Sequence, residues 1–125
     1  MRVGIYARSG SEGCGVEIQL QTLRSLCKKK GYTIAGEYAD YHTPANAGKP
    51  EYEKLLGDVR SGKIDCIACY SLDRLTRNTK QLYCLIDDLY MANVKIMTFL
   101  ESIEAESLDI RVLRLVLEIL DKFRK

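Results

Sequence analysis

Four short apolar segments alternate with segments of helical periodicity, and this alternation constrains the fold more than any other feature of the chain. The apolar segments are residues 3–7, 33–38, 64–70 and 94–99. The helical segments are residues 16–30, 50–60, 79–90 and about 107–125. Gly31 marks the end of the first and Pro50 the first turn of the second. In the third we expect Leu82, Ile86, Leu89 and Tyr90 to face inward. Strands that alternate with helices pair in parallel and are covered by helices on both faces. The sequence therefore predicts an α/β domain with a mainly parallel sheet of four to five strands, helices on both faces and a long C-terminal helix.

A single domain accounts for the whole chain, because 125 residues suit one hydrophobic core. We expect the α/β core to occupy about residues 1–105 and the long helix to occupy about residues 107–125. The segment 64–70 is apolar on both faces, which is typical of a strand at the centre of a parallel sheet.

The formal net charge is only +2, so no basic field covers the whole surface. A nucleic-acid partner would have to be held by local clusters of cations. Five cysteines without paired spacings favour reduced thiols over a disulfide framework. The chain enters its first apolar segment without a signal-peptide pattern, and its apolar runs are too short to cross a bilayer. We expect a cytoplasmic domain with no membrane contact.

The segment 70–78 places polar residues between the third apolar segment and the helix that follows. Arg74 and Arg77 are three residues apart, so in a helix they share a face. Two parallel guanidinium groups repel each other unless an anion lies between them, and arginine suits bidentate phosphate contact. One interpretation is a phosphate site, and the other is a surface cluster of ion pairs that includes Asp73.

Three loops of the predicted fold follow strands and should meet at the carboxyl edge of the sheet, where parallel sheets bind ligands. They are residues 8–15, 40–50 and 71–78. Together they carry the cations Arg8, Lys49, Arg74 and Arg77, and Lys80 follows just after the third loop. Their hydroxyl groups belong to Ser9, Ser11, Thr43, Ser71 and Thr76, and their carboxylates to Asp40 and Asp73. Several cations around a serine-bearing loop favour phosphoryl transfer, in which charge stabilisation does most of the catalytic work.

Other chemistries fit the sequence less well. His42 is the only histidine, so a Ser-His-Asp triad and a histidine-rich metal site lack components. Cys66 and Cys69 have the spacing of a redox pair, but they lie in an apolar strand whose successive side chains alternate between faces. The glycine-rich segment 10–15 matches neither the dinucleotide nor the Walker pattern.

The last predicted helix is apolar around most of its circumference, and only a line through Arg111, Arg114, Glu118, Asp121 and Lys125 is polar. A helix packed on one sheet needs an apolar stripe of roughly 100°. The excess predicts a second partner, which is either another copy of the protein or a further part of the same chain. For a second copy, we expect contacts through Leu113, Leu117 and Leu120.

Four motifs resemble the catalytic domain of the serine recombinases, the resolvase/invertase family, and above all its large-serine branch of transposon and phage integrases. They are Tyr6-Ala7-Arg8, Glu17-Ile18-Gln19, Asp40 through Lys49-Pro50, and the segment Leu72-Asp73-Arg74-Leu75-Thr76-Arg77 with its flanking residues Ser71 and Asn78. The resemblance covers essentially the whole chain, and the last motif is highly specific.

The resemblance implies that a serine attacks a DNA phosphodiester, which gives a 5′-phosphoserine link and a free 3′-hydroxyl before the strands rejoin. It implies no metal and no other cofactor, a homodimer that forms a tetramer in a synaptic complex, and a bacterial or mobile-element origin. It places Arg8, Arg74 and Arg77 around the scissile phosphate, with Gln19 and Asp73 in the catalytic set. We add Lys49, Asp40, Thr43 and Lys80 as expected DNA or phosphate contacts.

The chain departs from the family pattern at the nucleophile. The family serine lies two residues after the strand-end arginine, and that position is Gly10 here. Three alternatives follow: Ser11 attacks, or less favourably Ser9 attacks, or the domain is inactive and only assembles or occupies DNA. A weaker alternative is a small phosphate-ester enzyme of the same α/β class. Lys49 stands where the family has an arginine, which keeps the charge but loses the bidentate geometry. We also expect a DNA-binding region to follow the last helix.

Overall fold

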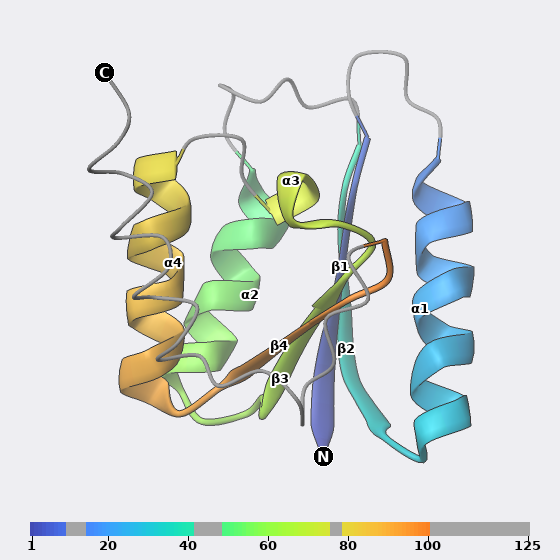
Figure 1. Ribbon diagram of the computed structural model, residues 1–125, viewed down its shortest axis with the longest axis horizontal. Helices are drawn as coiled ribbons and strands as arrows, with labels where there is room; N and C mark the ends of the chain where they lie inside the picture. The colour runs from blue at the N-terminus through green and yellow to red at the C-terminus, as the bar shows by residue number, and fades with distance from the viewer. Residues whose placement is uncertain (10–14, 42–48, 76–78, 101–125) are drawn as a thin grey trace.

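The computed structural model describes residues 1–9, 15–41, 49–75 and 79–100. Four strands form one parallel sheet in the order β2-β1-β3-β4 (Figure 1). Their bounds are Arg2–Arg8 for β1, Thr33–Asp40 for β2, Cys66–Cys69 for β3 and Lys95–Thr98 for β4. The predicted parallel sheet is confirmed, with β3 between β1 and β4 as its apolar sequence indicated.

Helices cover both faces of the sheet, as predicted (Figure 1). Helix α1 (Val16–Lys30) packs on one face, whereas α2 (Pro50–Arg60) and α4 (Thr79–Ala92) pack on the other. The short helix α3 (Leu72–Leu75) follows β3 at the carboxyl edge of the sheet. The predicted long helix over residues 107–125 lies outside the described residues. Within the described part of the chain, no helix is long and apolar enough to cross a membrane.

The helix ends follow from local sequence. Gly31 ends α1 in the left-handed region, at φ 75°, and its N–H reaches the carbonyls of Cys27 and Lys28. A left-handed residue after the last turn suits glycine, and the three lysines before it complement the helix dipole. Pro50 occupies the first turn of α2, where its missing N–H costs no hydrogen bond.

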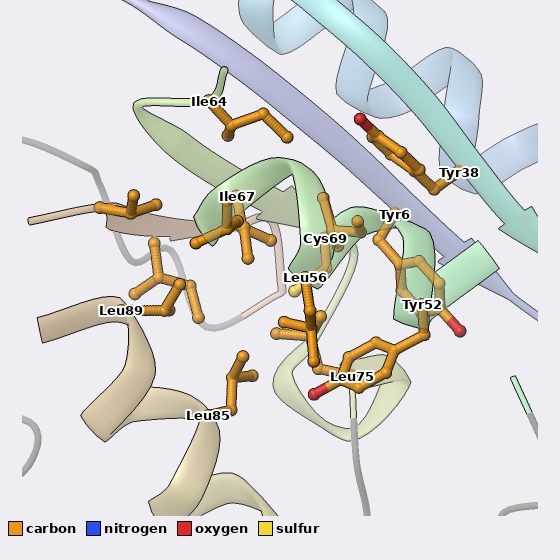
Figure 2. Close-up of a cluster of buried hydrophobic side chains, with 14 of the residues drawn as sticks. Tyr6, Tyr38, Tyr52, Leu56, Ile64, Ile67, Cys69, Leu75, Leu85 and Leu89 are labelled. Atoms are coloured by element: carbon orange, nitrogen blue, oxygen red, sulfur yellow. The ribbon is translucent and has the colours of Figure 1, made fainter. Parts of the chain in front are cut away.

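The sheet separates two hydrophobic cores, because successive strand side chains point to opposite faces. One core lies between the sheet and α1, and the other lies between the sheet and the helices α2, α3 and α4 (Figure 2). Cys66 belongs to the first core and Cys69 to the second. The prediction that these two side chains point to opposite faces of the strand is therefore confirmed. Leu75 of α3 is fully buried in the second core, which anchors that short helix against the sheet.

The inward face of α4 differs in one position from the prediction. Ile86 and Leu89 are buried as expected, and Leu82 is partly buried. The prediction that Tyr90 points inward is wrong, since 37% of it is exposed. Leu85 is buried instead, because it lies one turn before Leu89 and shares its face.

Candidate phosphate-binding site

Two arginines from distant parts of the chain meet at the carboxyl edge of the sheet. Arg8 is the last residue of β1, and Arg74 lies in α3. The Nε of Arg8 donates to the carbonyl of Arg74 at 3.2 Å, and Nη1 of Arg74 donates to the carbonyl of Arg8 at 3.4 Å. Arg8 is 2% exposed, so its guanidinium is removed from bulk water. The predicted convergence of Arg8 and Arg74 is therefore observed.

Gln19 fixes the main chain at the end of β1. Its Oε1 accepts a hydrogen bond from the N–H of Arg8 at 3.2 Å, and its Nε2 donates to the carbonyl of Arg8 at 3.0 Å. Gly15 lies just before α1 with φ 94°, a backbone conformation that favours glycine. That turn brings the first turn of α1, and with it Gln19, beside the strand end. The described contacts of Gln19 thus hold Arg8 in place.

Lys49 adds a third cation from the loop before α2. Its Nζ donates to the carbonyl of Leu75 at 3.0 Å and lies 4.5 Å from the ring centroid of Tyr52, a cation–π distance. Burial and the nearby charge of Arg8 lower the pKa of Lys49, and Asp40 and Glu53 oppose that shift only in part. The positive charge of Lys49 is therefore held in an environment that disfavours it.

The Nε atom of Arg74 is buried and has no hydrogen-bond partner among the described residues. Buried polar groups in native proteins are nearly always paired, so an orphaned donor on a cation indicates a place for an acceptor. The main-chain carbonyls of Arg8, Arg74 and Leu75 each accept from a cation at this edge, and the nearby carboxylate of Asp40 is bonded to other protein donors. An anion with several oxygens, such as a phosphate, matches this donor set.

Asp40 ends β2 beside Arg8 and is 3% exposed. Its Oδ2 accepts from the hydroxyl of Tyr6 at 2.7 Å and from the N–H of Tyr52 at 3.1 Å. Its Oδ1 accepts from the N–H of Glu51 at 3.0 Å. These contacts make Asp40 a cap on the amino end of α2 and not only the phosphate contact that the sequence predicts.

Tyr6 also belongs to this edge, although the sequence marks it only as part of the Tyr6-Ala7-Arg8 motif. It lies on β1 two residues before Arg8 and is fully buried against Tyr52, at 5.5 Å between ring centroids (Figure 2). Burial, followed by the hydrogen bond to Asp40, raises the pKa of its hydroxyl. A tyrosine in an otherwise aliphatic strand was the signal available, since a buried hydroxyl needs a partner.

The remaining predicted site residues fall into two groups. Ser9 is fully buried, with its N–H bonded to the carbonyl of Asp40 at 3.1 Å, and Lys80 lies exposed at the start of α4. Outside the described part lie Gly10, Ser11, Thr43, Arg77, Leu113, Leu117 and Leu120, together with the side chain of Asp73. Across the described residues, no group of three or more His, Cys, Asp or Glu side chains is placed to hold a metal ion.

Comparison with known proteins agrees with this geometry. The family model described as Resolvase, N terminal domain matches residues 3–125. Its matched span covers nearly the whole chain, and the chain therefore belongs to the resolvase N-terminal domain family. The predicted family is confirmed. No curated protein sequence matches the chain.

Solved structures share the fold. The N-terminal catalytic domain of TP901-1 integrase is similar with a TM-score of 0.86 and 22% identity, over 98% of this chain and 95% of that one. A resolvase family site-specific recombinase from Streptococcus pneumoniae gives 0.82 and 20%, over 98% and 86%. The C-terminal catalytic domain of ISC1926 TnpA, an IS607-like serine recombinase, gives 0.71 and 23%, over 98% and 80%. At these identities the likeness is one of fold.

Proposed function

We propose that this domain is the catalytic domain of a serine site-specific recombinase, which cleaves and rejoins DNA through a 5′-phosphoserine intermediate. One observation carries the proposal: Arg8, Lys49 and Arg74 converge from three separate elements at one edge of the sheet. Bringing three cations together is costly unless an anion offsets their repulsion. The orphaned Nε of Arg74 adds a donor for that anion.

The reaction conserves phosphoester bonds. The serine Oγ forms a bond to phosphorus as the bond from phosphorus to the 3′-oxygen breaks; the serine proton passes to a base, and the 3′-oxygen takes up a proton. Rejoining reverses these steps, with the 3′-hydroxyl as nucleophile. The cations offset the charge that builds on the phosphoryl oxygens, so the main contribution of these side chains is electrostatic stabilisation of the transition state. We propose that Asp73 and Arg77 complete this set.

Ser11 is the nucleophile that we favour. Ser9 is fully buried, and its main chain is bonded to β2, which removes it from a substrate as large as DNA. Gly10 offers no hydroxyl. The test is a nicked suicide DNA substrate, with the adduct mapped by mass spectrometry. We expect an adduct on Ser11 that is lost in Ser11→Ala and kept in Ser9→Ala; an adduct on another residue would overturn this assignment.

A second candidate function rests on Gly10, which occupies the nucleophile position of the family motif. In that case the domain binds DNA and assembles on it without cleaving. Absence of any adduct, together with DNA binding that depends on Arg74, would support this alternative. Gain of an adduct in Gly10→Ser would then show that the remaining site is competent. Hydrolysis of phosphomonoesters without DNA would favour a small phosphate-ester enzyme instead.

We propose that the domain self-associates through the segment 107–125, as a dimer that pairs into a tetramer on DNA, inside the cell. The support is the apolar excess of that segment, which includes Leu113, Leu117 and Leu120. Analytical ultracentrifugation should show an assembly that Leu113→Glu or Leu117→Glu dissociates. A strict monomer whose size neither substitution changes would contradict this proposal.

A further inference from the structure

Helix α2 begins in an unusual way at the edge that carries the cations. Lys49 is the residue before its first turn, and a lysine side chain has no acceptor with which to cap the free N–H groups of a helix. Pro50 has no N–H, so the first amides that need a partner belong to Glu51 and Tyr52. Both donate to the carboxylate of Asp40, which belongs to β2.

The position of Asp40 depends in turn on Tyr6. The hydroxyl of Tyr6 donates to Oδ2 of Asp40 at 2.7 Å in a buried environment. The same ring packs edge-on against Tyr52 (Figure 2). The ammonium of Lys49 lies over the face of the Tyr52 ring. The carboxylate therefore has three protein donors, and two of them belong to the turn that follows Lys49.

The reach of Lys49 across the site depends on where that turn begins. Its ammonium has to span from the start of α2 to the carbonyl of Leu75 in α3, at 3.0 Å. A shift of the first turn would move the ammonium away from Arg8 and Arg74. Small displacements of groups that stabilise charge have large effects on rate.

We propose that Tyr6 is a positioning residue, which acts through the Asp40 carboxylate on the first turn of α2 and so presents the ammonium of Lys49 beside Arg8 and Arg74. The effect on DNA rests on the proposed function, in which Lys49 binds phosphate. The effect on the helix end does not, because it is a property of the free protein.

The chain offers a matched control on the neighbouring strand. Tyr38 pairs with Tyr6 in the register of β1 and β2, and its hydroxyl donates to Oδ2 of Asp58 at 2.5 Å. Asp58 lies near the other end of α2. Tyr38→Phe therefore removes the same kind of bond between the sheet and the same helix, but far along the helix from Lys49.

The first measurement uses the full chain without DNA. Amide hydrogen exchange should show that Tyr6→Phe lowers the protection of the Glu51 and Tyr52 amides on the order of tenfold, as expected when a hydrogen bond to a charged group is weakened. Tyr38→Phe should leave these two amides within about twofold of the parent. Unchanged protection in Tyr6→Phe would overturn the proposal, whatever the protein does with DNA. Asp40→Asn serves as a second variant and should lower the same protection.

The second measurement is a double-mutant cycle on binding and cleavage of the suicide DNA. Tyr6→Phe should weaken DNA binding or slow cleavage on the order of tenfold. In a Lys49→Gln background the same substitution should change either quantity by less than about twofold, because the ammonium it positions is absent. Equal losses in both backgrounds would show that Tyr6 does not act through Lys49. If the parent neither binds nor cleaves the DNA and Lys49→Gln changes nothing, the proposed function fails. The hydrogen-exchange measurement still decides whether Tyr6 positions the first turn of α2.

Discussion

The two edges of the sheet treat their cations in opposite ways. At the amino edge, Arg2 donates from Nε and Nη2 to both carboxylate oxygens of Asp65, at 3.1 Å and 3.0 Å, and both side chains are about half exposed. At the carboxyl edge, Arg74 and Lys49 donate to main-chain carbonyls, and Arg8 is buried beside them. The first edge pairs its cation with an exposed carboxylate, whereas the second uses its buried carboxylate, Asp40, to cap the amino end of α2.

The contrast between the two edges shows where to look for function in a nearly neutral protein. An exposed ion pair with its carboxylate contributes little and is screened by salt. Partly buried cations that donate to main-chain carbonyls, such as Lys49 and Arg74, instead lie in an environment that disfavours their charge and that a bound anion can improve. The formal net charge of +2 conceals this contrast, because it averages over both edges.

The largest effect is expected from removing a cation of the carboxyl edge. Arg74→Ala should reduce the yield of covalent DNA adduct by about a hundredfold or more, since removing one donor from a preorganised anion site typically costs this much. Arg2→Ala, the matched arginine of the amino edge, should leave the yield within about twofold. If the domain binds DNA without cleaving it, the same pair is compared by DNA affinity. Similar losses in both variants would show that the edges do not differ in function.

The next effect concerns the support of Arg8. Gln19→Leu keeps the size of the side chain but leaves the N–H and carbonyl of Arg8 without the partner that Gln19 supplies. We expect the free energy of unfolding to fall by about 1–3 kcal/mol, the cost of removing the hydrogen bond from the buried N–H of Arg8. The carbonyl of Arg8 still accepts from Arg74. Urea denaturation measures this loss. Gln21→Leu, on the exposed side of α1, is the control and should have little effect.

A smaller effect tests whether the charge of Lys49 lowers the stability of the fold. Lys49→Met should leave the free energy of unfolding unchanged or raise it by up to about 1 kcal/mol at neutral pH, although it should weaken DNA binding. Because the folded-state pKa of Lys49 is lowered, the unfolded chain binds more protons, so the parent gains stability as the pH rises from that folded value toward the ordinary 10.5. The variant should lack this rise. Urea denaturation between neutral pH and pH 10.5 compares the two, and identical pH profiles would contradict the lowered pKa.

Much of the fold was predictable because it depends on local patterns. The alternation of apolar and periodic segments gave the parallel order, and the signals at Gly31 and Pro50 gave correct helix ends. The long C-terminal helix stays a prediction. The misplacement of Tyr90 arose because periodicity alone does not decide which edge of a broad apolar face points inward.

The candidate site was predictable in its residues but only partly in its contacts. Arg8, Arg74 and Lys49 followed from loops that end at one edge of the sheet. The partners of Gln19 and Asp40 did not, because both make hydrogen bonds to main-chain groups, which every residue carries and no sequence motif marks. The sequence placed these two residues in the site as groups for the substrate, and the geometry gives them contacts within the protein.

The smallest effect is expected at the amino edge, in the pKa of Asp65 beside Arg2. Hydrogen bonds from the Arg2 side chain, and then from its main-chain N–H, lower the pKa of Asp65 to about 2. A lowered carboxyl pKa stabilises the fold above the ordinary value of 3.8, and that contribution is lost as the pH falls through 3.8 toward 2. Arg2→Ala should raise the pKa only part of the way to 3.8, because the main-chain N–H remains at 2.8 Å.

Carbon-detected NMR titration of the Asp65 carboxyl at low and high salt measures this shift. We expect high salt to reduce the difference between the parent and Arg2→Ala, since both side chains are exposed and their attraction is screened. A difference that salt leaves intact would mean that this pair behaves like a buried one. The two edges would then differ only in whether the arginine has a carboxylate partner, and not in how deeply the charges are buried.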